Sequence, residues 1–445
     1  MTVSDKLPAF LRTRLAGRDT LRRAMDNSFW LFCDQLLRMA AGLLVGIWMA
    51  RYLGPERYGW LSYALAVVGM VGSFTSLGIN TVVVRELVRT PAEAGAWMGT
   101  AFFLRSAGAS VGFLACVALA WLQSVPADSV RPMIVIVAAG MFFQALDVID
   151  LLFQAKGESW VSAWVRMAAC ILASLLRVGL ILGHAPVWAF AAAGVAELAL
   201  CAAGWLRAAQ RRGWRASEWR CERARVRALL HESWPLALSG LAIYAQAYFD
   251  QLVIGSMLGG GELGQYAAAI RLVSVFAFVP MVVQTVAAPE VTRAKRDDET
   301  LYRRRLHGLY RFMFGLFLIT AVPLILLGPP AARWLYGASY AGTAVLLPWL
   351  AFRLFFTNLG VARSVFITNE GLFRFGLLTA VVGAVVNLAL NFVLVPRWGA
   401  RGAVLASYGS FGVTTFALEV FQPRARANLR LMASAVCLPW RRFAG

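Results

Sequence analysis

Residues 53–59 read Leu53-Gly54-Pro55-Glu56-Arg57-Tyr58-Gly59, and residues 258–264 read Leu258-Gly259-Gly260-Gly261-Glu262-Leu263-Gly264. In both stretches glycines allow a tight turn, a glutamate follows, and an aromatic residue opens the next apolar segment. A second pair of stretches recurs in the same order: Phe153-Gln154-Ala155-Lys156-Gly157 and Phe366-Ile367-Thr368-Asn369-Glu370-Gly371. Two ordered matches at similar spacing favour a chain built from two similar halves.

Long apolar segments surround these turns and set the class of the protein. The chain has 445 residues, of which 60% are hydrophobic and 15% are charged. Apolar runs of about 20 residues are each long enough to cross roughly 30 Å of hydrocarbon as a helix. We expect spans at 28–50, 60–80, 97–122, 132–154, 160–183, 186–206, 233–257, 265–289, 308–328, 343–368, 375–396 and 401–421. The sequence therefore predicts an all-α, polytopic membrane protein with about 12 transmembrane helices.

The net charge of +20 needs an explanation, because a basic protein can also be a nucleic-acid binder. Of the 43 basic residues, 30 lie in the termini or in one set of loops and the span ends beside them, six lie in the alternate loops or the span ends beside those, and seven lie deeper within the spans. This asymmetry follows the positive-inside rule and places both termini in the cytoplasm. The basic loops also suit anionic lipid headgroups. We therefore expect membrane lipids, and no nucleic acid, as partners.

The two halves are expected to form two lobes. Each half has six spans and begins on the cytoplasmic side, so the repeat is parallel, with two six-helix lobes around a central cavity. We expect the substrate to bind between the lobes, near the midplane of the membrane. The expected segments are a cytoplasmic amphipathic and basic segment (1–27), an N-lobe (28–206), a basic cytoplasmic linker (207–231), a C-lobe (232–421) and a basic cytoplasmic tail (422–445).

Arginines within the spans are the most unusual feature of the composition. Each costs at least about 2.5–3.5 kcal/mol at a helix centre unless it faces water or a partner. They are Arg38, Arg105, Arg166, Arg177, Arg271, Arg353 and Arg363. So many positive charges predict a wet, cationic interior whose occupant is an anion.

The helix faces of these arginines suggest different roles. Asp34 and Arg38 are four residues apart and can pair on one face, either as a packing ion pair or as a gate at the cavity wall. Arg166 and Arg177 share a face of one span, where they either bind an anion together or extend to the headgroups at its two ends. Arg353 lies on the most polar stripe of the second half, which we expect to line the cavity.

Carboxylates in the spans are candidates for gating or ion coupling. They are Asp34, Asp147, Asp150, Asp250 and Glu197. They can neutralise arginines of neighbouring helices, which is the interpretation we favour slightly, or one of them can accept a proton or sodium ion. Tyr244, Tyr248 and Gln251 can contact a sugar, although tyrosines at such positions more often serve in packing.

The sequence holds little that points to catalysis. Its three histidines are far apart, and it contains no GxxxxGK[ST] loop, GxSxG elbow or HExxH pair. The six cysteines show neither CxxC pairs nor metal-ligand spacing. We therefore expect no enzyme activity, no cofactor, no metal site and no disulfide.

Residues 51–59, together with Leu77-Gly78-Ile79-Asn80 and Arg85-Glu86, resemble the amino-terminal signature of the polysaccharide (O-antigen or exopolysaccharide) flippase family. That family belongs to the multidrug/oligosaccharidyl-lipid/polysaccharide exporter superfamily. The resemblance implies transport of an undecaprenyl-diphosphate-linked oligosaccharide from the cytoplasmic to the outer leaflet of the bacterial inner membrane. The implied partners are this lipid-linked oligosaccharide and, as a further candidate, the polysaccharide polymerase or export machinery.

Under this resemblance the anion is a diphosphate, whose oxygens match the donor fork of a guanidinium. The expected ligands are Arg38, Arg353 and Arg363 first, followed by Arg166, Arg177 and Arg271. A cation-coupled multidrug exporter of the same fold is the alternative, but it predicts an acidic, aromatic cavity. A lipid II flippase, which usually has two more helices, and a non-transporting scaffold of a polysaccharide assembly complex are further alternatives.

Overall fold

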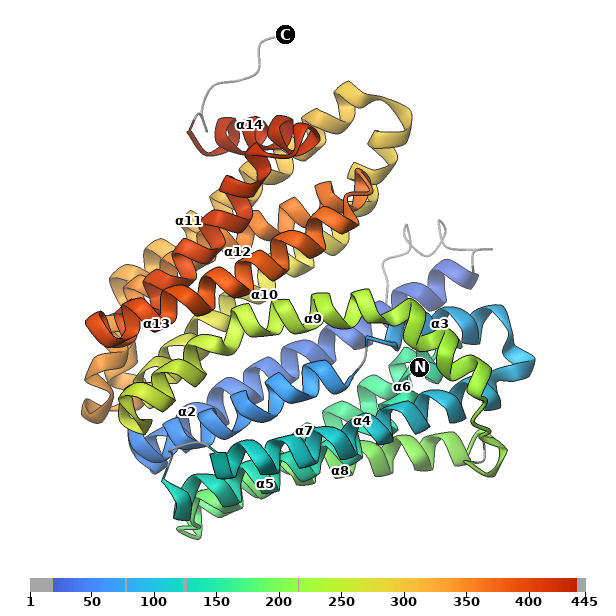
Figure 1. The fold of residues 1–445 in the computed structure, drawn as a ribbon, viewed down its shortest axis with the longest axis horizontal. Coiled ribbons are helices and arrows are strands. Elements are labelled where there is room, and N and C mark those ends of the chain that lie inside the picture. Colours follow the sequence, from blue (N-terminus) through green and yellow to red (C-terminus); the bar gives the residue numbers. More distant parts are fainter. Residues whose placement is uncertain (1–18, 77, 123–125, 215, 438–445) are drawn as a thin grey trace, which may run out of the picture. The chain divides into compact units, whose positions relative to one another are not determined.

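The computed structural model describes residues 19–76, 78–122, 126–214 and 216–437, and within these ranges the chain is helical with no strand (Figure 1). The helices are α2 (Asp19–Thr75), α3 (Asn80–Arg89), α4 (Ala94–Leu122), α5 (Ala127–Gln144), α6 (Val148–Ala155), α7 (Ser159–Leu182), α8 (Val187–Gln210), α9 (Arg223–Leu258), α10 (Gly260–Asp297), α11 (Glu299–Tyr336), α12 (Ala341–Asn369), α13 (Phe373–Gly412) and α14 (Pro423–Cys437). Most of the predicted amphipathic segment 1–27 and the end of the predicted tail lie outside the described residues.

The predicted spans lie largely on these helices, although α2 ends at Thr75 within the span expected at 60–80 and α13 ends at Gly412 within the span expected at 401–421. By length and composition, nine stretches of the described chain are long and apolar enough to cross a membrane. Two of them contain two predicted spans each, because α2 bends at Gly54 and α13 bends at Gly399. The predicted span at 233–257 lies on α9, which is not among the nine. The prediction of an all-α polytopic membrane protein with about 12 spans is therefore confirmed.

The bends have a local cause. Gly54 has φ 74° and Gly399 has φ 60°, in the left-handed region that a residue with a β-carbon rarely adopts. Pro55 directly follows Gly54, and its fixed φ and missing N–H suit the first turn of the next helix. The turn chemistry of the sequence thus fixes where each long helix changes direction.

The chain divides into two compact units. Unit 1 comprises Met1–Met49 and Val67–Gly240, and unit 2 comprises Ala50–Ala66 and Leu241–Gly445. The turn between the first two spans thus belongs to unit 2, and α9 contributes to both units. The lobe boundaries expected at 206 and 232 follow the sequence and stay a prediction.

Unit 1 is built on α4, α5, α7 and α8, each of which packs against at least one of the others (Figure 1). The short helix α3 is amphipathic and buries Val82, Val83 and Leu87 against α4 and α6. Its opposite face carries Arg85, whose Nη1 and Nη2 donate to the two carboxylate oxygens of Glu232 on α9 at 2.5 and 2.7 Å. Bidentate pairing of this kind fixes orientation as well as distance.

Unit 2 is built on α10, α11 and α12, which pack against one another in every combination. Their shared core includes Tyr310, Met313 and Leu359, all fully buried. The amphipathic helix α14 packs on α11 and buries Ala425 and Met432 in the same core (Figure 1). The segment after the last span is therefore part of the folded unit.

The two turn motifs pack directly on each other within unit 2. A β-carbon on Gly59 would overlap the carbonyl oxygen of Gly260, and one on Gly264 would overlap the carbonyl oxygen of Pro55. Gly59 and Gly264 occupy equivalent positions in the two motifs, and so do Pro55 and Gly260. The two contacts are therefore equivalent, and a pseudo-two-fold axis relates one to the other. The structure thus shows the internal repeat that the sequence predicts.

The second pair of repeated stretches also adopts one conformation. Gly157 and Gly371 are both left-handed, with φ 69° and 65°. The N–H groups of these glycines donate to the carbonyl oxygens of Gln154 and Thr368 at 3.0 and 3.2 Å. The N–H groups of the residues that follow, Glu158 and Leu372, donate to the carbonyl oxygens of Phe153 and Ile367 at 2.8 and 2.9 Å. This is the Schellman ending of a helix, formed identically in both halves.

The close contact of the turns predicts that Gly264→Ala destabilises the protein. The new β-carbon would meet the Pro55 backbone, which cannot move aside as a flexible side chain can, so overpacking should cost about 1–3 kcal/mol. Gly261→Ala in the same turn is the matched control, because no atom lies within 4 Å of its β-carbon position. Thermal unfolding in detergent should show a lower midpoint for Gly264→Ala only, and equal midpoints would contradict the proposed close packing.

Candidate functional site

One arginine of unit 1 joins two buried carboxylates. Arg166 on α7 donates through Nε to Asp34 on α2 at 2.8 Å and through Nη1 to Asp150 on α6 at 3.1 Å. The side chains of Asp34 and Asp150 are 5% and 14% exposed. The three helices are therefore tied at one point by charge, and the sequence-predicted residues Asp34, Asp150 and Arg166 come together.

Arg38 stands at the exposed edge of this cluster. The sequence predicts its pairing with Asp34, and the structure shows an ion pair between Arg38 Nε and Asp34 Oδ1 at 3.7 Å. The Arg38 side chain is 43% exposed, whereas that of Arg166 is 16% exposed. Asp34 thus binds Arg166 closely and Arg38 loosely.

Two further pairs lie within unit 1. Arg177 on α7 donates through Nη2 to Glu197 on α8 at 2.7 Å, and both side chains are about one-quarter exposed or less. Arg105 on α4 lies 3.7 Å from Asp147 and also donates to the Asn80 side chain. Arg166 and Arg177 share a helix face as expected, but each has a carboxylate partner of its own.

Asp250 is the centre of a polar cluster in unit 2. It is fully buried on α9 and accepts hydrogen bonds from Tyr266 Oη on α10 at 2.7 Å, Ser407 Oγ at 2.6 Å and Asn391 Nδ2 at 2.9 Å, the last two on α13. Two fully buried atoms at this point, Asn391 Oδ1 and Asn387 Nδ2, have no hydrogen-bond partner. Buried unpaired polar atoms are rare because each carries an uncompensated desolvation penalty.

Arg353 on α12 borders the Asp250 cluster. Its Nη1 lies 3.8 Å from Asp250 Oδ2, and its guanidinium lies 5.2 Å from the ring centre of Phe411. Its side chain is 15% exposed. Asp250 therefore binds three neutral donors closely and this cation at longer range.

Arg363 belongs to a separate network in the same unit. Its Nε donates to Glu419 Oε1 at 2.7 Å, and Asn428 Nδ2 on α14 donates to Glu419 Oε2 at 3.2 Å. Asn428 Oδ1 in turn accepts from Tyr310 Oη at 2.9 Å. Glu419, in the short helix η7 (Leu418–Val420), is completely buried, so this network fastens α14 to α11 and α12.

The remaining predicted residues are Arg271, Tyr244, Tyr248 and Gln251. Arg271 on α10 donates through Nη1 to Tyr58 Oη at 3.3 Å. Tyr244 and Tyr248 stack on α9, with ring centres 4.3 Å apart and planes at 18°. Tyr248 is 38% exposed, and Gln251 is 6% exposed. A stacked, partly exposed tyrosine pair is a suitable platform for a sugar ring.

Sequence reasoning missed several residues of these networks. Glu419 carried a usable signal, since it is a lone carboxylate near the end of an apolar span. Asn428 carried none, because it lies in a polar tail beyond the last span. Asn387, Asn391 and Ser407 are small polar residues that occur in many membrane helices as packing contacts, so their gathering around one carboxylate is visible only in the structure.

Comparisons with known proteins agree on one family and one fold. A family model described as "Polysaccharide biosynthesis protein" matches residues 48–345. The chain is similar to the EPS I polysaccharide export inner membrane protein EpsE of Ralstonia nicotianae, with 24% identity over 370 residues, 79% of this chain and 83% of the relative.

Among solved structures, the fold is similar to an inward-facing multidrug resistance MATE family transporter of the MOP superfamily, with a TM-score of 0.72 and 16% identity over 89% of this chain and 96% of that one. It is also similar to the lipid II flippase MurJ in an inward closed conformation, with a TM-score of 0.68 and 14% identity over 93% of this chain and 91% of that one. At these identities the likeness concerns the two-lobe fold alone. Since the family model matches well over half of its length, the chain belongs to the polysaccharide biosynthesis protein family, and it has the membrane-embedded, two-lobe helical fold of the MOP superfamily.

Proposed function

We propose that this protein is a flippase that moves undecaprenyl-diphosphate-linked oligosaccharide units from the cytoplasmic to the outer leaflet of a bacterial inner membrane. Membership of a polysaccharide biosynthesis family and a relative named for polysaccharide export support this proposal. The protein then acts as a transporter by alternating access and not as an enzyme, with both termini in the cytoplasm. Its product supplies surface polysaccharide or exopolysaccharide synthesis.

The observation that carries the proposal is the exposed Arg38. It lies ten residues from one end of its predicted span and twelve from the other, roughly 15 and 18 Å along a helix. An arginine side chain does not extend that far, so Arg38 cannot place its charge among the headgroups. Its side chain is nevertheless 43% exposed. Asp34 contacts Arg38 only at 3.7 Å, so a half-exposed arginine side chain in the middle of a membrane calls for water or a second anion, and we propose the diphosphate of the substrate as that anion.

The other predicted arginines differ in how closely a carboxylate already binds them. Arg353 is the second ligand we propose, because Asp250 is bound by three other donors and lies 3.8 Å away. Arg166, Arg177 and Arg363 each donate to a carboxylate at 2.7–2.8 Å, and their charge is used first in holding helices together. For Arg271 we propose that it lines the cationic cavity.

Asp250 is the group we propose for ion coupling. It is fully buried, its acceptor oxygens face only neutral hydrogen-bond donors at close range, and unpaired amide atoms of Asn387 and Asn391 lie beside it. We propose that this carboxylate binds the coupling cation during transport and then releases Arg353. Asp34, Asp150 and Glu197 each accept a hydrogen bond from an arginine at 2.7–3.1 Å instead, which favours a structural or gating role. Asp147 lies 3.7 Å from Arg105, and we propose a gating role for it as well. Tyr244, Tyr248 and Gln251 are proposed sugar contacts.

Loss of the gene should leave lipid-linked oligosaccharide on the wrong side of the membrane. In a deletion strain we expect undecaprenyl-diphosphate-linked oligosaccharide to accumulate on the cytoplasmic face while surface polysaccharide disappears. Sidedness is measured by enzymatic labelling of the sugar in intact and in opened spheroplasts. Normal amounts on the outer face, in a strain with no second flippase gene, would overturn the proposal and make multidrug export the next function to test.

Substitution of Arg38 should impair transport without unfolding the protein. Arg38→Gln removes the guanidinium fork, and loss of one charge-assisted contact predicts a fall of about tenfold in surface polysaccharide. Arg38→Lys keeps the charge but not the fork, so an intermediate amount is expected. Arg303→Gln is the control, because it removes the same charge from a 59% exposed arginine outside the predicted spans. Full transport by Arg38→Gln at normal protein levels would exclude Arg38 from the site.

Substitution of Asp250 should uncouple transport from an ion gradient. Asp250→Asn keeps the shape of the side chain but cannot bind a proton or sodium ion as a carboxylate does. In vesicles we expect an imposed proton or sodium gradient to stimulate oligosaccharide translocation by the wild type and not by the variant. Asp34→Asn serves as the comparison in unit 1. If Asp250→Asn still responds to the gradient and Asp34→Asn does not, coupling belongs to the Asp34 cluster.

A further inference from the structure

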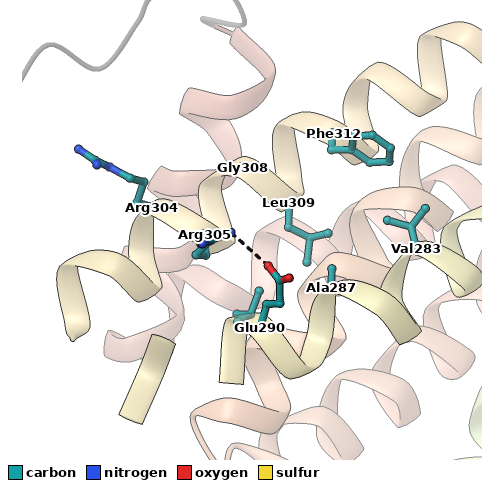
Figure 2. A pocket seen from close by; sticks show the side chains of 9 residues that line it. Val283, Ala287, Glu290, Arg304, Arg305, Gly308, Leu309 and Phe312 are labelled. Atoms are coloured by element: carbon teal, nitrogen blue, oxygen red, sulfur yellow. Dashed lines mark hydrogen bonds and ion pairs between the residues drawn. The ribbon is translucent and has the colours of Figure 1, made fainter. Parts of the chain in front are cut away.

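A groove between α10 and α11 lies outside every cluster described so far. It encloses about 350 Å³, within the range of roughly 300–1,000 Å³ in which proteins bind small molecules (Figure 2). Val283 and Ala287 on α10 and Leu309 and Phe312 on α11 form its apolar part. Phe312 is 56% exposed, so a large apolar side chain is left without protein cover at one end.

The other end of the groove is charged. Glu290 on α10 and Arg304 and Arg305 on α11 lie at this mouth, where Arg305 Nη1 is 3.1 Å from Glu290 Oε2. In Figure 2 this ion pair crosses the mouth, while the Arg304 guanidinium extends away from it. The mouth therefore carries two positive charges and one negative charge.

The change in polarity coincides with the expected edge of the membrane. The predicted spans end at 289 on α10 and begin at 308 on α11, so the charged mouth lies beyond the span ends, on the side that the positive-inside rule assigns to the cytoplasm. The apolar part lies inside the spans. A groove that is apolar at hydrocarbon depth and positive at headgroup depth matches an amphipathic anion of the cytoplasmic leaflet.

The existing ion pair does not close the mouth to such a ligand. The side chains of Arg305 and Glu290 are 55% and 61% exposed, and ion pairs this exposed contribute little to stability. A phosphate can therefore take over Arg305 and recruit the exposed Arg304, which forms a stronger, charge-assisted contact. One phosphodiester charge would also balance the single excess positive charge of the mouth.

Gly308 keeps the middle of the groove open. It lies on α11 between the charged and apolar parts, and no atom lies within 4 Å of the position of an added β-carbon. A glycine in a helix interior is unfavourable compared with most other residues. Here its absence of a side chain leaves a continuous path from the arginines to Phe312.

We propose that the α10–α11 groove binds one anionic phospholipid of the cytoplasmic leaflet. Arg304 and Arg305 bind its phosphate, and an acyl chain lies against Val283, Ala287 and Phe312. The proposal concerns a resident lipid and does not depend on the transported substrate. Its physical basis is the alignment of charge, apolar surface and open space along one groove at the membrane boundary.

Native mass spectrometry of the purified full chain tests the proposal. With phosphatidylglycerol added, we expect the wild type to retain one lipid and to prefer it over phosphatidylethanolamine. Arg304→Gln combined with Arg305→Gln should lower this retention about tenfold, since it removes the charge-assisted contacts. Arg303→Gln is the matched control, because Arg303 is equally exposed at 59%, pairs with Glu299 and does not line the groove.

Gly308→Leu provides a second variant that should fold at least as well as the wild type. Leucine favours a helix more than glycine does, and the groove has room for its side chain. Loss of lipid retention with an unchanged or higher thermal midpoint would support the groove as the binding site. The proposal would be overturned if Gly308→Leu retained as much phosphatidylglycerol as the wild type, or if the wild type retained phosphatidylethanolamine equally well. It would also be overturned if undecaprenyl diphosphate displaced phosphatidylglycerol at a lower concentration, because the groove would then be a substrate site.

Discussion

A guanidinium in hydrocarbon has no water to bind, and this constraint governs the interior of the protein. Arg38, Arg105, Arg166, Arg177, Arg353 and Arg363 each lie within 4 Å of a carboxylate, and Arg271 donates to the Tyr58 hydroxyl. Most of these ion pairs join two different helices. Arg38 is the exception, because it contacts Asp34 on its own helix, and Asp34 also pairs with Arg166 on α7. Replacing one partner of a buried pair leaves an uncompensated charge, while replacing both partners is often neutral. The pairs therefore specify which helices are neighbours more than they add net stability.

The symmetric and asymmetric parts of the chain serve different purposes. The contacts of Gly59 with Gly260 and of Gly264 with Pro55 repeat one geometry, as do the helix endings at Gly157 and Gly371. The charges do not repeat. In unit 1 a carboxylate on α2 pairs with arginines of α2 and α7, whereas in unit 2 a carboxylate on α9 faces hydroxyl and amide donors and a more distant arginine. Duplication thus accounts for the scaffold, and divergence of the two interiors accounts for chemistry that differs between the units.

Much of the fold follows from the sequence because its signals are local. Span length and turn glycines are each read within a short window, and they correctly predicted the helical spans and the repeat. Partners across helices are not local: Arg166 and Asp34 are 132 residues apart, and Arg363 and Glu419 are 56 apart. Helical periodicity places Arg363 on one side of its helix, but it does not show that Glu419 and Asn428 lie on that side. The sequence predicts on which face of its helix a residue lies, but it does not predict which residue of another helix contacts it.

The way each arginine is held also decides which of them an anionic substrate can recruit. If Arg363 or Arg177 turned toward a diphosphate, Glu419 or Glu197 would lose its close cationic partner in a largely buried position. Arg38 differs, because Asp34 keeps Arg166 at 2.8 Å when the 3.7 Å contact with Arg38 is lost. Arg353 differs in the length of its contact, since it lies 3.8 Å from Asp250, which accepts three closer hydrogen bonds from Tyr266, Ser407 and Asn391. Arg38 and Arg353, one in each unit, thus hold their carboxylates only at long range, and this looser contact supports the proposal that they bind the substrate.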